Sequence, residues 1–131
     1  MTVIKNVTCD DLLIQARKTL KILDADEVLN LISGGAKLLD VREPAEFETG
    51  HLFGAAHVPR GLLEFMVGEH PALQNVEQNL VVYCKNGGRS SLAANLLQTM
   101  GFTNIYMLAD GIENWVASGK DVEIPENQYQ S

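Results

Sequence analysis

The chain has 131 residues, of which 46% are hydrophobic and 21% charged, a composition typical of one soluble globular domain. Ten Lys and Arg against 17 Asp and Glu give a net charge of -7, which argues against broad nucleic-acid binding because that needs a basic surface. No apolar run approaches the roughly 18 residues of a membrane helix, and no secretory signal is recognisable. Two widely separated cysteines favour free thiols, so we expect a reduced, cytoplasmic domain without membrane contact.

The first predicted elements are a helix, a short strand and a second helix. Thr8 and Asp11 have the spacing of a capping box, and the apolar residues that follow predict an N-terminal helix. A short strand is predicted at 21–23. The next helix is predicted at 25–33, where an aspartate precedes it and a pair of glycines ends it.

Short segments bounded by turn residues occupy the middle of the chain. Strands are predicted at 37–41 and 55–58, since each is short, largely apolar and bounded by turn residues. Between them, Pro44 suits the first turn of a small helix that Gly50 ends. A further helix is predicted at 62–67.

The second half of the chain contains the clearest strand, Leu80–Tyr83, a continuous apolar run of the kind found in parallel sheets. A helix is predicted from Ser90 to Met100, a last core strand at 104–108 and a last helix at 112–117. Strands that alternate with helices in this way predict an α/β domain with a mainly parallel sheet. The expected organisation is a helical extension at 1–20, the α/β domain at 21–122 and a flexible tail at 123–131.

The segment that follows the clearest strand is the candidate active site, and it reads Cys84-Lys85-Asn86-Gly87-Gly88-Arg89-Ser90. Ligands of parallel sheets bind beyond the carboxyl ends of the strands, where this cysteine lies. The two glycines allow backbone N–H groups to turn toward one centre, and the first N–H groups of the next helix carry partial positive charge. Together with Lys85 and Arg89, these groups should lower the pKa of Cys84 and hold a thiolate. The sequence predicts a reactive nucleophile that faces a pocket for an anionic substrate; the alternative is an inert strand-end cysteine.

Four stretches occur in order along the chain: Leu39 to Pro44 with Glu46-Phe47, then Gly50-His51-Leu52 with Gly54 to Pro59, then the loop Cys84 to Ser90, and last Asp110-Gly111-Ile112 with Trp115. Together they resemble the signatures of the rhodanese-like sulfurtransferases of the single-domain type. The resemblance extends over most of the chain, and Asp110 stands where the family often has a glycine. It implies a rhodanese-like fold of about five mainly parallel strands flanked by helices.

The resemblance also implies an activity. The chain would transfer a sulfane sulfur from a small anionic donor such as thiosulfate to a thiol or cyanide, through a Cys84 persulfide and with ping-pong kinetics. Arg89 and, by family analogy, Arg42 would bind the oxyanion of the donor, while Lys85 adds positive charge at the rim. The other expected substrate-binding residues are Asn86, Gly87, Gly88 and Ser90. No metal or organic cofactor is needed.

Three polar residues within the resembling stretches are expected to have structural roles. Asp40 lies at a strand end near the loop, and we expect it to pair with an arginine or with backbone amides rather than to transfer a proton. His51 and His57 lack metal-ligand partners at suitable spacing, so we expect them to hydrogen-bond turns.

Two other functions remain open. A persulfide-relay or regulatory module that works by protein contact would also keep Cys84, with the N-terminal helix as a docking element or as an extra layer on the core. A cysteine phosphatase or arsenate reductase is disfavoured, because those enzymes place five residues between Cys and Arg whereas four, Lys85 to Gly88, intervene here. The roles of the N-terminal helix and Cys9, the physiological donor and acceptor, and the oligomeric state stay open.

Overall fold

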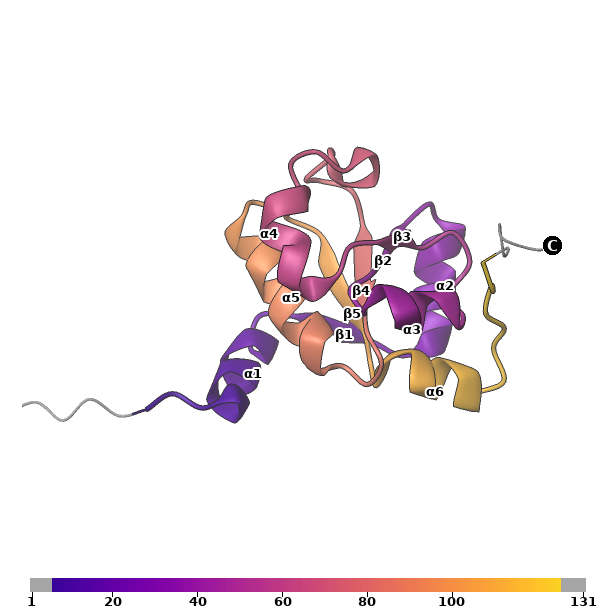
Figure 1. Cartoon of the computed structure of the whole chain (residues 1–131), viewed down its shortest axis with the longest axis horizontal. Coiled ribbons are helices and arrows are strands. Elements are labelled where there is room, and N and C mark those ends of the chain that lie inside the picture. Colours follow the sequence, from indigo (N-terminus) through magenta and orange to yellow (C-terminus); the bar gives the residue numbers. More distant parts are fainter. Residues whose placement is uncertain (1–5, 126–131) are drawn as a thin grey trace, which may run out of the picture.

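A parallel sheet of five strands forms the centre of the structure, a computed structural model that describes residues 6–125 (Figure 1). The strands are β1 (Lys21–Leu23), β2 (Lys37–Asp40), β3 (Ala56–His57), β4 (Leu80–Tyr83) and β5 (Ile105–Leu108). Their order across the sheet is β1-β5-β4-β2-β3, and every neighbouring pair is parallel. The prediction of an α/β domain with about five mainly parallel strands is confirmed.

Helices cover both faces of this sheet. Those of the described residues are α1 (Cys9–Arg17), α2 (Ala25–Ser33), α3 (Pro44–Glu48), α4 (Leu63–Met66), α5 (Gly88–Thr99) and α6 (Gly111–Ala117), with 3-10 turns at Arg60–Leu62 and Pro71–Leu73. In Figure 1, α1, α4 and α5 lie on one side of the strands, and α2 and α6 lie on the other. None of the helices that the structure describes is long and apolar enough to cross a membrane.

Strand β4 shows how the sheet divides the core into two layers. Its side chains are all buried, and they alternate between the two faces as the pleat requires. Leu80 and Val82 pack in the cluster that contains residues of α4 and α5, whereas Val81 and Tyr83 pack in the cluster that contains residues of α2 and α6. Cys84, the next residue, belongs to the α5 side, so its side chain lies in the layer beneath the start of α5.

Several predicted boundaries differ from the structure by one or two residues. Two differences concern the start of α5 and the C-terminal segment. Helix α5 begins at Gly88 rather than Ser90, because Gly87 takes a left-handed φ of 106° and forms the N-cap. In the segment expected to be a flexible tail, Glu123 forms an antiparallel bridge with His51, with N–H···O distances of 2.7 and 2.8 Å. The remainder of that segment, 126–131, lies outside the described residues.

Candidate active site

Three polar groups of the loop after β4 surround the sulfur of Cys84. The backbone N–H of Gly87 donates to Sγ at 3.1 Å, and that of Ser90 donates to it at 3.4 Å. The Sγ atom also lies 3.3 Å from the hydroxyl oxygen of Ser90. The left-handed conformation of Gly87 turns the chain back toward the sulfur, which few residues other than glycine do at low cost. Donors aimed at one atom form a cradle that suits a negatively charged sulfur.

The Cys84 side chain is fully enclosed by the protein. Its exposed fraction is 0%, and so is that of Ser90. This placement differs from the expected nucleophile that faces a pocket for an anionic substrate. Hydrogen bonds in such a dry site are stronger than in water, so the cradle acts more strongly on Sγ. A molecule that is to contact Sγ could do so only after the surrounding side chains move.

The N-terminus of α6 holds the backbone of the loop in place. The N–H of Ile112 donates to the carbonyl of Cys84 at 2.9 Å, and the N–H of Glu113 donates to that of Lys85 at 3.1 Å. Gly111, with a φ of 65°, lies so close that a Cβ atom there would overlap both carbonyl oxygens. The position of Cys84 therefore depends on the absence of a side chain at residue 111.

An ion pair connects the loop to α3. Arg89 donates to the two carboxylate oxygens of Glu46 at 2.6 and 3.0 Å. The hydrogen bond from Arg89 lowers the pKa of Glu46 to about 2, and the same bond raises the pKa of Arg89, with a smaller contribution from the proximity of Cys84. Arg89 thus lies within electrostatic reach of the sulfur, but its guanidinium is engaged by an internal carboxylate.

Arg42 forms the second arginine–carboxylate pair, and this pair is buried. Its guanidinium donates to both oxygens of Asp40, at distances down to 2.7 Å, and to the carbonyls of Glu46 and Gly50 at 3.3 and 2.6 Å. Burial disfavours its charge, but the bond and the charge of Asp40 outweigh burial, so the pKa of Arg42 is raised. All three guanidinium nitrogens of Arg42 hydrogen-bond groups of the protein itself. From the sequence, we expected this guanidinium to bind the oxyanion of the donor.

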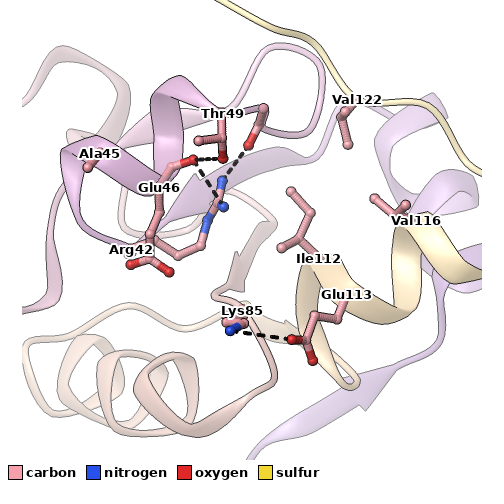
Figure 2. Close-up of a pocket in the computed structure, with 10 residues that line it drawn as sticks. Arg42, Ala45, Glu46, Thr49, Lys85, Ile112, Glu113, Val116 and Val122 are labelled. Atoms are coloured by element: carbon pink, nitrogen blue, oxygen red, sulfur yellow. Dashed lines mark hydrogen bonds and ion pairs between the residues drawn. The ribbon is translucent and has the colours of Figure 1, made fainter.

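Lys85 lies at the edge of a cavity of about 640 Å³ between α3 and α6 (Figure 2). Its Nζ is 3.6 Å from the carboxylate of Glu113, and more than half of each side chain is exposed. Figure 2 shows Ile112 and Val116 of α6 on one side of the cavity and Arg42 with Glu46 on the other. The cavity therefore has apolar walls and charged edges. Its lining includes Lys85, the residue that follows Cys84 in the chain.

The remaining expected site residues lie at the ends of the cradle. Gly88 is the first residue of α5, and the side chain of Asn86 is exposed in the loop.

His51 and His57 each hydrogen-bond a backbone carbonyl, at 2.8 and 2.7 Å, in the manner expected for turn residues. Within residues 6–125, no three His, Cys, Asp or Glu side chains are grouped so as to hold a metal ion.

Four residues that contact the loop were not singled out as site residues by the sequence. They are Arg17, Glu46, Gly111 and Ser91. Glu46 and Gly111 occur in the stretches that resemble the family, and this resemblance could have marked them as site residues. Arg17 and Ser91 carried none, because the contact between them joins segments 74 residues apart in the chain.

Comparisons with known proteins give the family of the chain. The rhodanese-like domain family matches residues 24–118. Thiosulfate sulfurtransferase GlpE of Pseudomonas aeruginosa is 31% identical over 97 residues, which cover 74% of this chain and 84% of GlpE. The uncharacterized protein YqhL of Bacillus subtilis is 40% identical over 80 residues, which cover 61% of this chain and 60% of YqhL.

Among solved structures, RPA3614 of Rhodopseudomonas palustris, a protein of unknown function described as a possible tyrosine phosphatase, superposes with a TM-score of 0.83 at 27% identity. The match covers 94% of this chain and 99% of that one. The family match spans most of the chain, and the loop, the sheet order and the relative GlpE agree with it. The chain therefore belongs to the rhodanese-like family, which includes sulfurtransferases.

Proposed function

We propose that this protein is a sulfurtransferase that moves a sulfane sulfur from a donor such as thiosulfate to a thiol or cyanide, with Cys84 as the nucleophile. The observation that carries the proposal is the convergence of the Gly87 and Ser90 N–H groups on Sγ. These groups stabilise negative charge on sulfur without a metal ion. The same donors would stabilise a persulfide, which is also an anion.

The reaction consists of two half-reactions. In the first, the Cys84 thiolate attacks the outer sulfur of thiosulfate, a sulfur–sulfur bond forms on the enzyme, and sulfite leaves with the electron pair of the broken bond. In the second, an acceptor thiolate or cyanide attacks the outer sulfur of the persulfide. That step restores the Cys84 thiolate and yields a persulfide of the acceptor or thiocyanate. No electrons enter or leave the system, so ping-pong kinetics without a redox cofactor are expected.

The two arginines have different roles in this proposal. Arg89 would bind the oxyanion of the donor, because its charge lies near Cys84 and its pair with Glu46 is partly exposed. Arg42 would instead fix the backbone around α3 through Asp40 and the carbonyl of Gly50. Lys85, exposed at the edge of the cavity, would add positive charge where an anionic donor approaches.

Access to the enclosed sulfur requires a movement of the site. The Arg89–Glu46 pair connects α3 to the loop, and Arg89 cannot bind a donor fully while it holds this carboxylate. We infer that an anionic donor replaces Glu46 on Arg89. Separation of the pair would free the guanidinium and remove one connection between α3 and the start of α5.

Intact-mass spectrometry tests the proposal. Treatment with thiosulfate should add about 32 Da, one sulfur atom, and cyanide should remove it. The Cys84→Ser variant should gain no mass. Cys9→Ser is the matched control, since Cys9 is exposed and free, and it should form the adduct like the unmodified protein. No adduct with thiosulfate or another sulfane donor, or an adduct that requires Cys9, would overturn the proposal.

The same preparations separate the alternative functions. An adduct that forms without measurable transfer to small thiols would favour a relay between proteins over a free-standing enzyme. Hydrolysis of an aryl phosphate faster than turnover of thiosulfate would replace sulfur transfer by phosphatase chemistry. We do not expect the second result, because four residues lie between Cys84 and Arg89, whereas those enzymes place five residues there.

A further inference from the structure

Arg17 joins the N-terminal helix to the back of the Cys84 loop. It is the last residue of α1 and lies outside the region, 24–118, that matches the rhodanese-like family. Its Nε donates to the hydroxyl oxygen of Ser91 at 3.0 Å, and one of its terminal nitrogens donates to the carbonyl of Gly87 at 3.5 Å. The guanidinium therefore reaches from α1 across the first turn of α5 to the residue whose N–H binds the sulfur.

The carbonyl of Gly87 is the point on which these contacts converge. It accepts hydrogen bonds from the Ser91 hydroxyl at 2.6 Å and from the Ser91 N–H at 3.2 Å, in addition to Arg17. Because Ser91 Oγ also accepts from Arg17, the three groups form a chain in which each bond polarises the next. Ser91 is fully buried, so it has no water to replace a lost partner.

Gly87 needs such an anchor more than another residue would. Its left-handed φ of 106° aims its N–H at Sγ, but glycine occupies many other conformations at little cost. Holding the carbonyl of Gly87 restricts rotation about its backbone and so keeps the N–H on the sulfur. The groups packed around its Cα, including Arg17 at 3.9 Å from an added Cβ, provide limited further support.

Helix α1 is itself fixed to the domain, so it can serve as a support for this contact. Ala16 is buried, and Thr19 exchanges hydrogen bonds with the Gln98 side chain of α5 at 3.1 and 3.3 Å. The capping box of Thr8 and Asp11 closes the other end of the helix. The contact thus arises from a packed helix and not from a lone exposed arginine.

We propose that Arg17 is a positioning residue for the active-site loop, which makes α1 a part of the sulfur-transfer site rather than only an extra layer on the core. Arg17 acts through Ser91 and Gly87 and does not contact the donor. The inference rests on the proposed function for its effect on turnover, but its effect on loop order stands independently. In the absence of Arg17, the Gly87 N–H should point at the sulfur for a smaller fraction of the time.

The test compares Arg17→Ala, Arg17→Lys and the control Lys18→Ala, all in full-length protein that carries Cys9→Ser. Lys18 is a suitable control because it is the adjacent cation and its Nζ contacts the exposed Gln15 side chain at 3.4 Å. The first readout is amide hydrogen exchange of the segment 84–91. The second is the pH profile of Cys84 alkylation together with kcat and KM for thiosulfate.

Arg17→Ala should speed exchange in 84–91 by at least about tenfold, because it removes two hydrogen bonds from a charged group. It should lower kcat by a similar factor and shift the alkylation profile to higher pH, while Lys18→Ala changes none of these. Arg17→Lys keeps the charge but cannot make both contacts, so it should resemble Arg17→Ala. Full recovery with lysine would mean that charge alone matters, and it would overturn the inference.

Two further outcomes separate this inference from the proposed function. If exchange in 84–91 is the same in Arg17→Ala and Lys18→Ala, Arg17 does not position the loop, whatever the turnover. If Arg17→Ala loosens the loop but the unmodified protein forms no sulfur adduct, the positioning role stands and the proposed function fails. Equal exchange increases along all of α5 in both variants would indicate general loosening of α1, which also contradicts the inference.

Discussion

Gly111 and Asp110 lie where the start of α6 contacts the Cys84 loop. Gly111 has a φ of 65° and lies against the carbonyls of Cys84 and Lys85, where no side chain fits. Asp110 has a φ of 58°, and within residues 6–125 it is the one residue other than glycine with a positive φ. Aspartate tolerates this conformation better than most residues, which accounts for a residue other than glycine at this position. The stretch Asp110-Gly111-Ile112 therefore brings the backbone of α6 into contact with the Cys84 loop.

Gly111→Ala should destabilise the protein and damage the site. We expect the free energy of unfolding to fall by about 3 kcal/mol, of which about 1 comes from the left-handed backbone and the rest from the clash. Urea denaturation measures the loss. The control is Gly119→Ala, because Gly119 also has a positive φ, 85°, but nothing lies within 4 Å of an added Cβ. Equal losses in the two variants would show that the contact with the Cys84 loop is unimportant.

Helices α3 and α5 are joined at the site by Glu46 and Arg89. The pair spans 43 positions of the chain and is partly exposed, which suits a contact that opens when a donor binds. Arg42, in contrast, ties the end of β2 to the α3 segment with a buried guanidinium. One arginine thus forms a buried connection between elements, and the other forms a partly exposed one.

Glu46→Gln should make Arg89 more available to the donor. The neutral amide competes less well for the guanidinium and removes a negative charge from the path of thiosulfate, so we expect KM to fall by about threefold to tenfold with little change in kcat. Steady-state kinetics at low ionic strength measure this effect. The control Asp26→Asn removes a carboxylate that pairs with Lys120 at 2.8 Å, outside the site. An unchanged or higher KM in Glu46→Gln would contradict the proposed exchange of partners on Arg89.

The same ion pair predicts a dependence of stability on pH. Arg89 holds the pKa of Glu46 at about 2, below its ordinary 4.5, so the unfolded chain takes up this proton at higher pH than the folded protein does. The contribution is complete above about pH 4.5 and is lost as the pH falls toward 2. Urea denaturation across this range should show a shallower pH dependence for Glu46→Gln than for the unmodified protein. Parallel curves would mean that the pair adds no stability.

At the scale of the whole molecule, the order of the elements was predictable from local patterns. Short apolar runs such as 80–83 lie between turn residues, and capping boxes at Thr8 and Asp24 mark the starts of α1 and α2. These signals act over a few residues, so the sequence displays them directly. The start of α5 was placed two residues late, because the left-handed Gly87 forms a cap without a capping side chain.

The geometry of the site was less predictable, because it depends on contacts between distant segments. The loop at 84–90 was recognisable from its glycines and cations, and the structure does bring the Gly87 and Ser90 N–H groups onto Sγ. The partners of Arg42 and the pairing of Arg89 with Glu46 arise only when the α3 segment packs beside the loop. The enclosure of Cys84 arises from residues of several segments that form one core cluster. A sequence pattern shows which charges are present, but not which of them the fold has already paired.

The two half-reactions can be run separately, and this tests the storage of sulfur on Cys84 most directly. Rapid mixing of the protein with excess thiosulfate, in the absence of any acceptor, should release one equivalent of sulfite per Cys84 and then stop. Removal of thiosulfate followed by addition of cyanide should then yield one equivalent of thiocyanate. If sulfite appears only when donor and acceptor are present together, no sulfur is stored on Cys84 and the proposed persulfide mechanism is contradicted.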